Sequence, residues 1–149
     1  MDIVWRDLHH SAISAKQLYQ MLALRCDVFI VEQHCAYLDV DGQDLAADNR
    51  HIFGMRGAEL VAYARILTPD NDNEPVAIGR VIVSSAARGL KLGERLMEQA
   101  LISCDRYWPG RRIYLSAQAH LQAFYGRFGF RVVSEPYLED GIPHIDMQK

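Results

Sequence analysis

Short apolar runs alternate with polar turns along most of the chain, a pattern typical of β-strands. The segment Arg56-Gly57-Ala58 separates two of these runs and predicts a hairpin. The proline-bounded stretch TPDNDNEP turns the chain into the next run, so we expect consecutive strands to be antiparallel. Seven runs have the composition of strands: 3–6, 51–55, 59–67, 76–85, 111–117, 130–133 and 142–147.

A helical pattern begins after the first strand. Ser14 and Gln17 have the spacing of a capping box, in which each side chain accepts a hydrogen bond from the other residue's backbone N–H. We expect this helix to bury Leu18, Leu22 and the stem of Arg25. The acidic stretch EQHCAYLDVDGQDLAADN that follows predicts a loop, with one short helix within it as the alternative.

Two further helices are predicted from their hydrophobic period. One apolar face runs along the first of them: Leu92, Leu96, Ala100 and Cys104, widened by Met97 and Leu101. The segment AHLQAFYGRF is the second, and Gly129 ends it. The strand–helix–strand unit around 76–117 should contain a parallel pair. We therefore expect an α+β sandwich, formed by residues 1–149 as one domain, with a mostly antiparallel central sheet of six or seven strands and helices on both faces.

Composition narrows the class of function. Half of the 149 residues are hydrophobic, and the net charge of -3 with a pI near 6.0 argues against a protein that binds nucleic-acid phosphates. The start MDIVWRDLHH lacks the apolar core of a signal or membrane span, so we expect a cytoplasmic protein without a membrane partner. Three cysteines without a CxxC pair and scattered histidines predict reduced thiols and no metal site.

The segment VIVSSAARGLKLGERLM is the most informative, because a buried strand passes through a short turn into a helix. The start of a helix presents unpaired N–H groups, and Gly89 and Gly93 would let a diphosphate approach them closely. Arg88 and Lys91 add positive charge at the same place. An ordinary strand–helix turn is the alternative. A P-loop and a GxGxxG motif are both absent from the sequence.

This turn resembles the coenzyme A pyrophosphate motif of the GNAT acetyltransferases, in which Arg or Gln is followed by two residues, Gly, one residue, and Gly or Ala. Arg88 and Gly93 match that motif, whereas Lys91 stands where the first glycine is usual. The segment AHLQAFYGRFGF is similar to the family's second signature. The segments LRCDVFIVEQ, DVDGQDL and EDGIPHIDM resemble one small branch of the family, the ElaA-type proteins.

The resemblance implies a GNAT-like fold with acetyl-CoA as cosubstrate. The pantetheine arm would lie between the strand ending at Val83 and the strand at 113–117, and the backbone of Val81 and Val83 would pair with its amides. The residues that would bind the coenzyme are Val81, Ile82, Val83, Arg88, Gly89, Leu90, Lys91, Leu92, Gly93 and Tyr125.

Aminolysis of a thioester needs an uncharged amine and a proton for the departing thiolate. Tyr125 matches the family's tyrosine that meets the coenzyme sulfur and would supply this proton. The general base is open among Glu32, His120 and His144, each of which could instead be a structural or solvated residue.

Arg65 and Arg80 lie inside two runs that otherwise look buried. Either they pair with carboxylates such as Asp39, Asp41 and Asp44, or they line the acceptor pocket and bind substrate.

The leading hypothesis is an N-acetyltransferase that acts on a small-molecule amine. Protein amino groups are a second class of acceptor. A catalytically silent acyl-CoA-binding module and an interaction protein with a merely structural turn are the alternatives from other classes, and a homodimer stays open.

Overall fold

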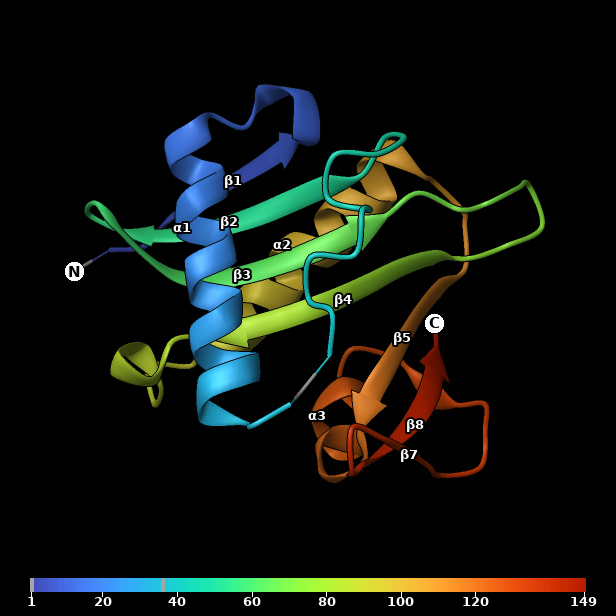
Figure 1. Cartoon of the computed structure of the whole chain (residues 1–149). Coiled ribbons are helices and arrows are strands. Elements are labelled where there is room, and N and C mark those ends of the chain that lie inside the picture. Colours follow the sequence, from blue (N-terminus) through green and yellow to red (C-terminus); the bar gives the residue numbers. More distant parts are fainter. Residues whose placement is uncertain (1, 36) are drawn as a thin grey trace.

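The computed structural model describes residues 2–35 and 37–149, so Ala36 of the predicted loop lies outside the described residues. Among these residues, eight strands form one sheet in the order β1-β2-β3-β4-β5-β8-β6, with β7 paired to β8 (Figure 1). The strands are β1 (Val4–His9), β2 (Arg50–Arg56), β3 (Glu59–Leu67), β4 (Val76–Val83), β5 (Ile113–Gln118), β6 (Arg131–Val132), β7 (Tyr137–Glu139) and β8 (Ile142–Gln148).

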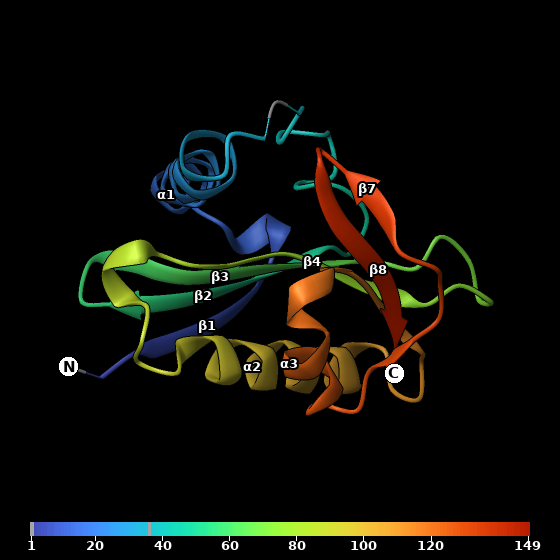
Figure 2. The same cartoon turned by 90° about the horizontal axis from the view of Figure 1, so that it is seen from below.

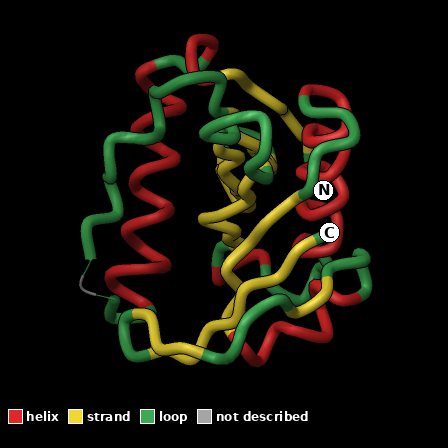
Figure 3. Tube along the Cα trace, turned by 90° about the vertical axis from the view of Figure 1, so that its right-hand side faces the viewer, coloured by secondary structure: helices red, strands yellow, loops and turns green. Residues whose placement is uncertain are grey.

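The predicted class is confirmed, because all strand pairs are antiparallel except β4 with β5. Helix α1 (Ala15–Arg25) covers one face of the sheet, and α2 (Leu92–Tyr107) covers the other (Figures 2 and 3). The strand that the hydrophobic pattern did not predict is β7, which is three residues long. No helix of the described chain is both long and apolar enough to cross a membrane.

Helix α1 begins at the predicted capping box, in which Ser14 and Gln17 exchange hydrogen bonds of 2.9 and 3.1 Å. Its buried stripe is displaced from the predicted one. Met21 and Leu24 are buried, whereas Leu18 and Leu22 are only half-buried at the edge of the same cluster. The reason is that the helical path continues through Cys26–Glu32 and buries Val28, which aligns with Leu24 and Met21, four and seven positions earlier.

The stripe of α2 agrees closely with the sequence pattern. Leu92, Leu96, Met97, Ala100 and Cys104 are buried against the sheet, and only Leu101 is less buried than predicted. The third helix is shorter than its pattern, because a 3₁₀ turn (Ala119–Leu121) precedes α3 (Gln122–Gly126). The chain then reverses at Gly129, whose φ of 91° is accessible to glycine without strain.

Strand β4 separates from the parallel strand β5 after a short paired stretch. It pairs with β5 only at Val76–Ile113 and Ala77–Tyr114. On its other side, the step from Tyr63 to Arg65 in β3 is matched by the longer step from Gly79 to Ile82 in β4, which is a β-bulge. Arg80 lies in this bulge with a φ of 52°. The bulge bends β4, so the sheet opens between β4 and β5.

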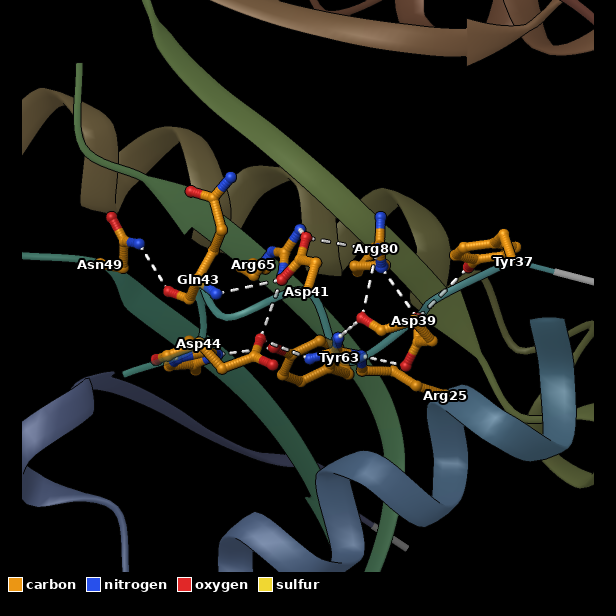
Figure 4. A network of polar contacts seen from close by, with 11 residues as sticks. Arg25, Tyr37, Asp39, Asp41, Gln43, Asp44, Asn49, Tyr63, Arg65 and Arg80 are labelled. Carbon is orange, nitrogen blue, oxygen red and sulfur yellow. Dashed lines mark hydrogen bonds and ion pairs between the residues drawn. The ribbon is translucent and has the colours of Figure 1, made fainter. Parts of the chain in front are cut away.

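Buried ion pairs hold the acidic loop between the helical extension of α1 and strand β2 (Figure 4). Arg25 is 0% exposed. Its Nε donates to Asp39 at 2.9 Å, and one terminal nitrogen donates to Asp44 at 2.6 Å. Only the stem of Arg25 was expected to be buried. The whole guanidinium is buried, because two carboxylates of the loop compensate its charge.

The same loop compensates the two arginines of the sheet. Arg65 donates to Asp41 at 2.9 Å and to Asp44 at 3.1 Å, while the Nε of Arg80 donates to Asp39 at 2.9 Å. The predicted ion pairing is therefore confirmed for both arginines. Burial by itself would raise the pKa of Asp44, but the hydrogen bonds and charges of Arg25 and Arg65 hold that pKa below its usual range.

We expect Asp44→Ala to lower the free energy of unfolding by about 3–5 kcal/mol, because Asp44 is 6% exposed and its loss leaves two buried guanidinium groups undercompensated. Urea denaturation at neutral pH measures the change. Asp72→Ala, at a fully exposed position of another loop, is the control and should change stability by less than about 0.5 kcal/mol. Equal effects of the two substitutions would show that the network does not stabilise the fold.

Candidate active site

The gap between β4 and β5 is a cavity of about 600 Å³, within the range of small-molecule sites. Residues 78–81 of β4 line one side, and Leu115 and Ser116 of β5 line the other. Tyr125 of α3 and Tyr37 of the loop also line it, as does the β7–β8 hairpin. A hollow of about 770 Å³ between α1 and the β2–β3 turn lies apart from these groups.

Tyr125 places a hydroxyl group in the wall of this cavity. It is 7% exposed, and no hydrogen-bond partner of its hydroxyl occurs in residues 2–35 and 37–149. Burial raises the pKa of Tyr125 to about 12, so the phenol is protonated at neutral pH. The hydroxyl oxygen is not one of the fully enclosed atoms that lack a partner, so it reaches the cavity, where a ligand can supply the hydrogen-bond partner.

His144 also lines the cavity and is 8% exposed. Its Nδ1 lies 2.7 Å from the carbonyl oxygen of Ile142. A carbonyl only accepts hydrogen bonds, so Nδ1 carries the proton and Nε2 of the neutral ring is free to accept one. That Nε2 lies 3.5 Å from a carboxylate oxygen of Glu139.

The two other candidate bases lie outside the cavity wall. Glu32 lies at the end of the helical extension of α1, where both of its oxygens accept from Arg88. The hydrogen bond from Arg88 lowers the pKa of Glu32, which makes it a weaker base. His120 lies exposed in the 3₁₀ turn after β5. These positions favour His144 among the three.

The predicted phosphate turn has the expected path from β4 into α2. Gly89 has a φ of 89°, and Lys91, at the N-cap of α2, has a φ of 57°. Lysine is strained in this left-handed region by about 1–2 kcal/mol, whereas glycine is not. This geometry explains why glycine is usual where Lys91 stands. No side chain of the described residues caps the first N–H groups of α2.

Arg88 lies exposed beside this turn and is already paired. Its Nε donates to the carbonyl oxygen of Val83 at 3.1 Å, and its terminal nitrogens donate to Glu32. Val83 is one of the residues whose backbone is expected to pair with pantetheine. The Arg88 side chain therefore occupies this backbone acceptor and is also held by a carboxylate.

The other predicted site residues differ in whether their side chains line the cavity, lie exposed or are buried in the core. Val81 and Arg80 line the cavity, and Leu90 is exposed in the turn. Ile82 and Leu92 have buried side chains, as expected for residues whose backbone would face the coenzyme. Arg65 differs from its predicted substrate-binding role, because it is 3% exposed, paired with two carboxylates and absent from the cavity wall.

Sequence reasoning missed a polar cluster beside the cavity. Asp146 accepts from the hydroxyls of Tyr114 at 2.8 Å and Tyr137 at 2.6 Å, and Tyr137 also contacts Ser116. Asp146 follows His144 by two positions on β8, so the period of a strand places both on one face. Within residues 2–35 and 37–149, His, Cys, Asp and Glu side chains form no group suited to a metal ion.

Comparison with known proteins identifies the family to which this arrangement belongs. A family model described as "Acetyltransferase (GNAT) domain" matches residues 11–149. The chain belongs to the GNAT acetyltransferase family. The resemblance stated from the turn and from the second signature is thereby confirmed, and the family supports acyl transfer as the class of reaction.

Two relatives match over almost the whole chain. Protein ElaA of Escherichia coli strain K12 is 60% identical over 147 residues, covering 99% of this chain and 96% of ElaA, and its crystal structure gives a TM-score of 0.95 over 99% of both chains. The structure of an acyl-CoA N-acyltransferase from Pseudomonas aeruginosa is 51% identical, with a TM-score of 0.96 over 99% of both chains. The structure of an aminoglycoside 6'-N-acetyltransferase complexed with coenzyme A is 16% identical, and the match covers 97% of this chain and 96% of that chain. Its TM-score of 0.71 shows that the two proteins share the fold.

We expect substitutions of Arg88 and Glu32 to change coenzyme A affinity in opposite directions. Arg88→Ala should weaken binding by about 1–3 kcal/mol, because a charge-assisted contact to the pyrophosphate is lost. Glu32→Gln should tighten binding by about two- to fivefold, because the carboxylate no longer competes for Arg88.

Isothermal calorimetry at low salt measures both affinities, with Arg106→Ala in the last turn of α2 as the control for loss of a cation. Weaker binding by both variants would show that Glu32 assists the coenzyme. Unchanged binding by both would place the pyrophosphate elsewhere.

Proposed function

We propose that this protein transfers the acetyl group of acetyl-CoA to an amine, and that a small-molecule amine is the acceptor. The observation that carries the proposal is the unpartnered, protonated hydroxyl of Tyr125 in the gap between β4 and β5. Membership of the GNAT family supports a coenzyme A thioester as donor. The relative named as an acyl-CoA N-acyltransferase supports transfer to nitrogen.

The gap offers a path for the pantetheine arm. Beyond Ala77, the described part of β4 has no paired residue on the β5 side, so its backbone groups can pair with an added extended chain. The turn at 88–93 would take the pyrophosphate at the start of α2, where backbone N–H groups and Arg88 meet negative charge. The thioester would then lie deep in the cavity, near Tyr125.

His144 is the base that we propose. An amine with a pKa near ~10.4 is mostly protonated at neutral pH, so its proton must leave before or during attack. Nε2 of His144 accepts this proton, directly or through water, and the carboxylate of Glu139 lies 3.5 Å from that nitrogen. Only the neutral amine then attacks the thioester carbonyl carbon.

Tyr125 completes the reaction. The nitrogen–carbon bond forms, the carbon–sulfur bond breaks, and the phenol donates its proton to the departing thiolate. The products are the acetylated amine and the free thiol of coenzyme A. After attack the nitrogen passes its second proton, directly or through water, to the phenolate, while His144 releases the first proton to solvent, so no further reactant is consumed.

We expect Tyr125→Phe to slow acetyl transfer by about 10²–10⁴-fold while acetyl-CoA affinity changes little, because this substitution keeps the ring and removes the proton donor. Single-turnover transfer to the best amine of a broad panel measures the rate. Tyr19→Phe, at an exposed position of α1, is the matched control.

If the Tyr125→Phe protein transfers acetyl groups at the parental rate, the hydroxyl has no part in the reaction and Tyr125 serves only in packing. Binding of coenzyme A without transfer to any amine or peptide would instead select the silent acyl-CoA-binding module.

A further inference from the structure

The charges that face the cavity do not cancel. Arg80 is the one arginine among the described residues that line the cavity. Its guanidinium is neutralised by the carboxylates of Asp39, at 2.9 Å, and Asp41, at 3.5 Å. The remaining charged groups of the wall are the carboxylates of Glu139 and Asp140. The net charge of the cavity wall is therefore negative.

Arg80 cannot offset these carboxylates, because it belongs to a closed set of charges. Three arginines (Arg25, Arg65 and Arg80) pair with three aspartates (Asp39, Asp41 and Asp44) across the loop and sheet (Figure 4). The guanidinium of Arg80 also lies over the ring of Tyr37, 5.2 Å from its centre. Its side chain is thus held against the wall by partners of its own.

The backbone holds the two carboxylates at the mouth of the cavity. Glu139 pairs with Ile142 across a two-residue turn, in which Asp140 has a φ of 51° and Gly141 a φ of 76°. Two successive positive φ values define the tight hairpin turn for which Asp-Gly is favoured. The turn therefore presents Glu139 and Asp140 from a regular hairpin rather than from a free loop.

Neither carboxylate has a cationic partner of permanent charge. The side chain of Glu139 is 54% exposed and lies 3.5 Å from Nε2 of His144, an imidazole that carries no permanent charge. In residues 2–35 and 37–149, no ion pair of Asp140 is found. The buried side chain of Tyr125, whose hydroxyl has no hydrogen-bond partner among the described residues, lines the same cavity and independently indicates a ligand there.

We infer that the acceptor is an amine that carries a second positive charge, such as an aliphatic diamine, with that second charge held by Glu139 and Asp140. This inference rests on the proposed function and specifies its substrate class. One amino group loses its proton to His144 and attacks, while the second stays protonated at the rim. An acceptor with a carboxylate in the second position would be repelled.

Three acceptors of equal chain length test the inference: 1,5-diaminopentane, 1-aminopentane and 5-aminopentanoate. We expect kcat/KM of acetyl transfer to be about tenfold higher for the diamine than for the monoamine, and lowest for the amino acid, since each partly exposed carboxylate contributes up to about fivefold. The preference should fall as salt is raised.

Asp140→Asn and Glu139→Gln should each reduce the ratio between diamine and monoamine, and the double variant should bring it near one. Asparagine tolerates the left-handed backbone at position 140, so this change isolates the charge. Glu135→Gln, an exposed carboxylate outside the cavity wall, is the control and should leave the ratio unchanged.

A parent enzyme that prefers the monoamine or the amino acid overturns the inference and leaves the proposed function standing, as does a ratio that the Asp140 and Glu139 variants do not change. Absence of transfer to every amine of a broad panel overturns both.

Discussion

The parting of β4 from β5 is the constraint on which the site depends. Two residue pairs, Val76–Ile113 and Ala77–Tyr114, hold these parallel strands together, and the bulge at Arg80 then turns β4 away. A closed sheet would bury the backbone groups of β4 in a ladder, whereas the open one leaves a cavity with strand edges on both sides. Tyr125 is buried beside that cavity because α3 follows directly from the end of β5.

The bulge also explains the ion-pair network. It carries Arg80 toward the loop rather than into solvent, and Asp39 of that loop binds both Arg80 and the buried Arg25. A buried guanidinium is tolerated only when carboxylates compensate its charge. If the acidic loop moved away, the arginines would become exposed to solvent or would stay buried without a partner. The network thereby fixes the loop that contributes Tyr37 to the cavity wall. Packing of the fold and shape of the site are thus coupled through one set of charges.

Local patterns predicted the elements, and long-range contacts decided the site. The period of α2 and the capping box at Ser14 were sufficient to place two helices, because each depends on residues within a few positions. The pairing of Glu32 with Arg88 depends on how far the path of α1 continues, which a sequence period does not define. His144 was indistinguishable from a structural strand histidine until the β7–β8 hairpin placed it in the cavity wall. The ion pairs of Arg65 and Arg80 were predictable in kind, since charges inside apolar runs need partners.

A crystal structure of the complex with coenzyme A tests the central claim, that the opened sheet is the acyl-transfer site, most directly. We expect the pantetheine arm between β4 and β5, the pyrophosphate at residues 88–93 with Arg88 released from Glu32, and the sulfur about 3–3.5 Å from the Tyr125 hydroxyl. A coenzyme that lies outside this gap, or a sulfur remote from Tyr125 with the Arg88–Glu32 pair intact, would contradict it.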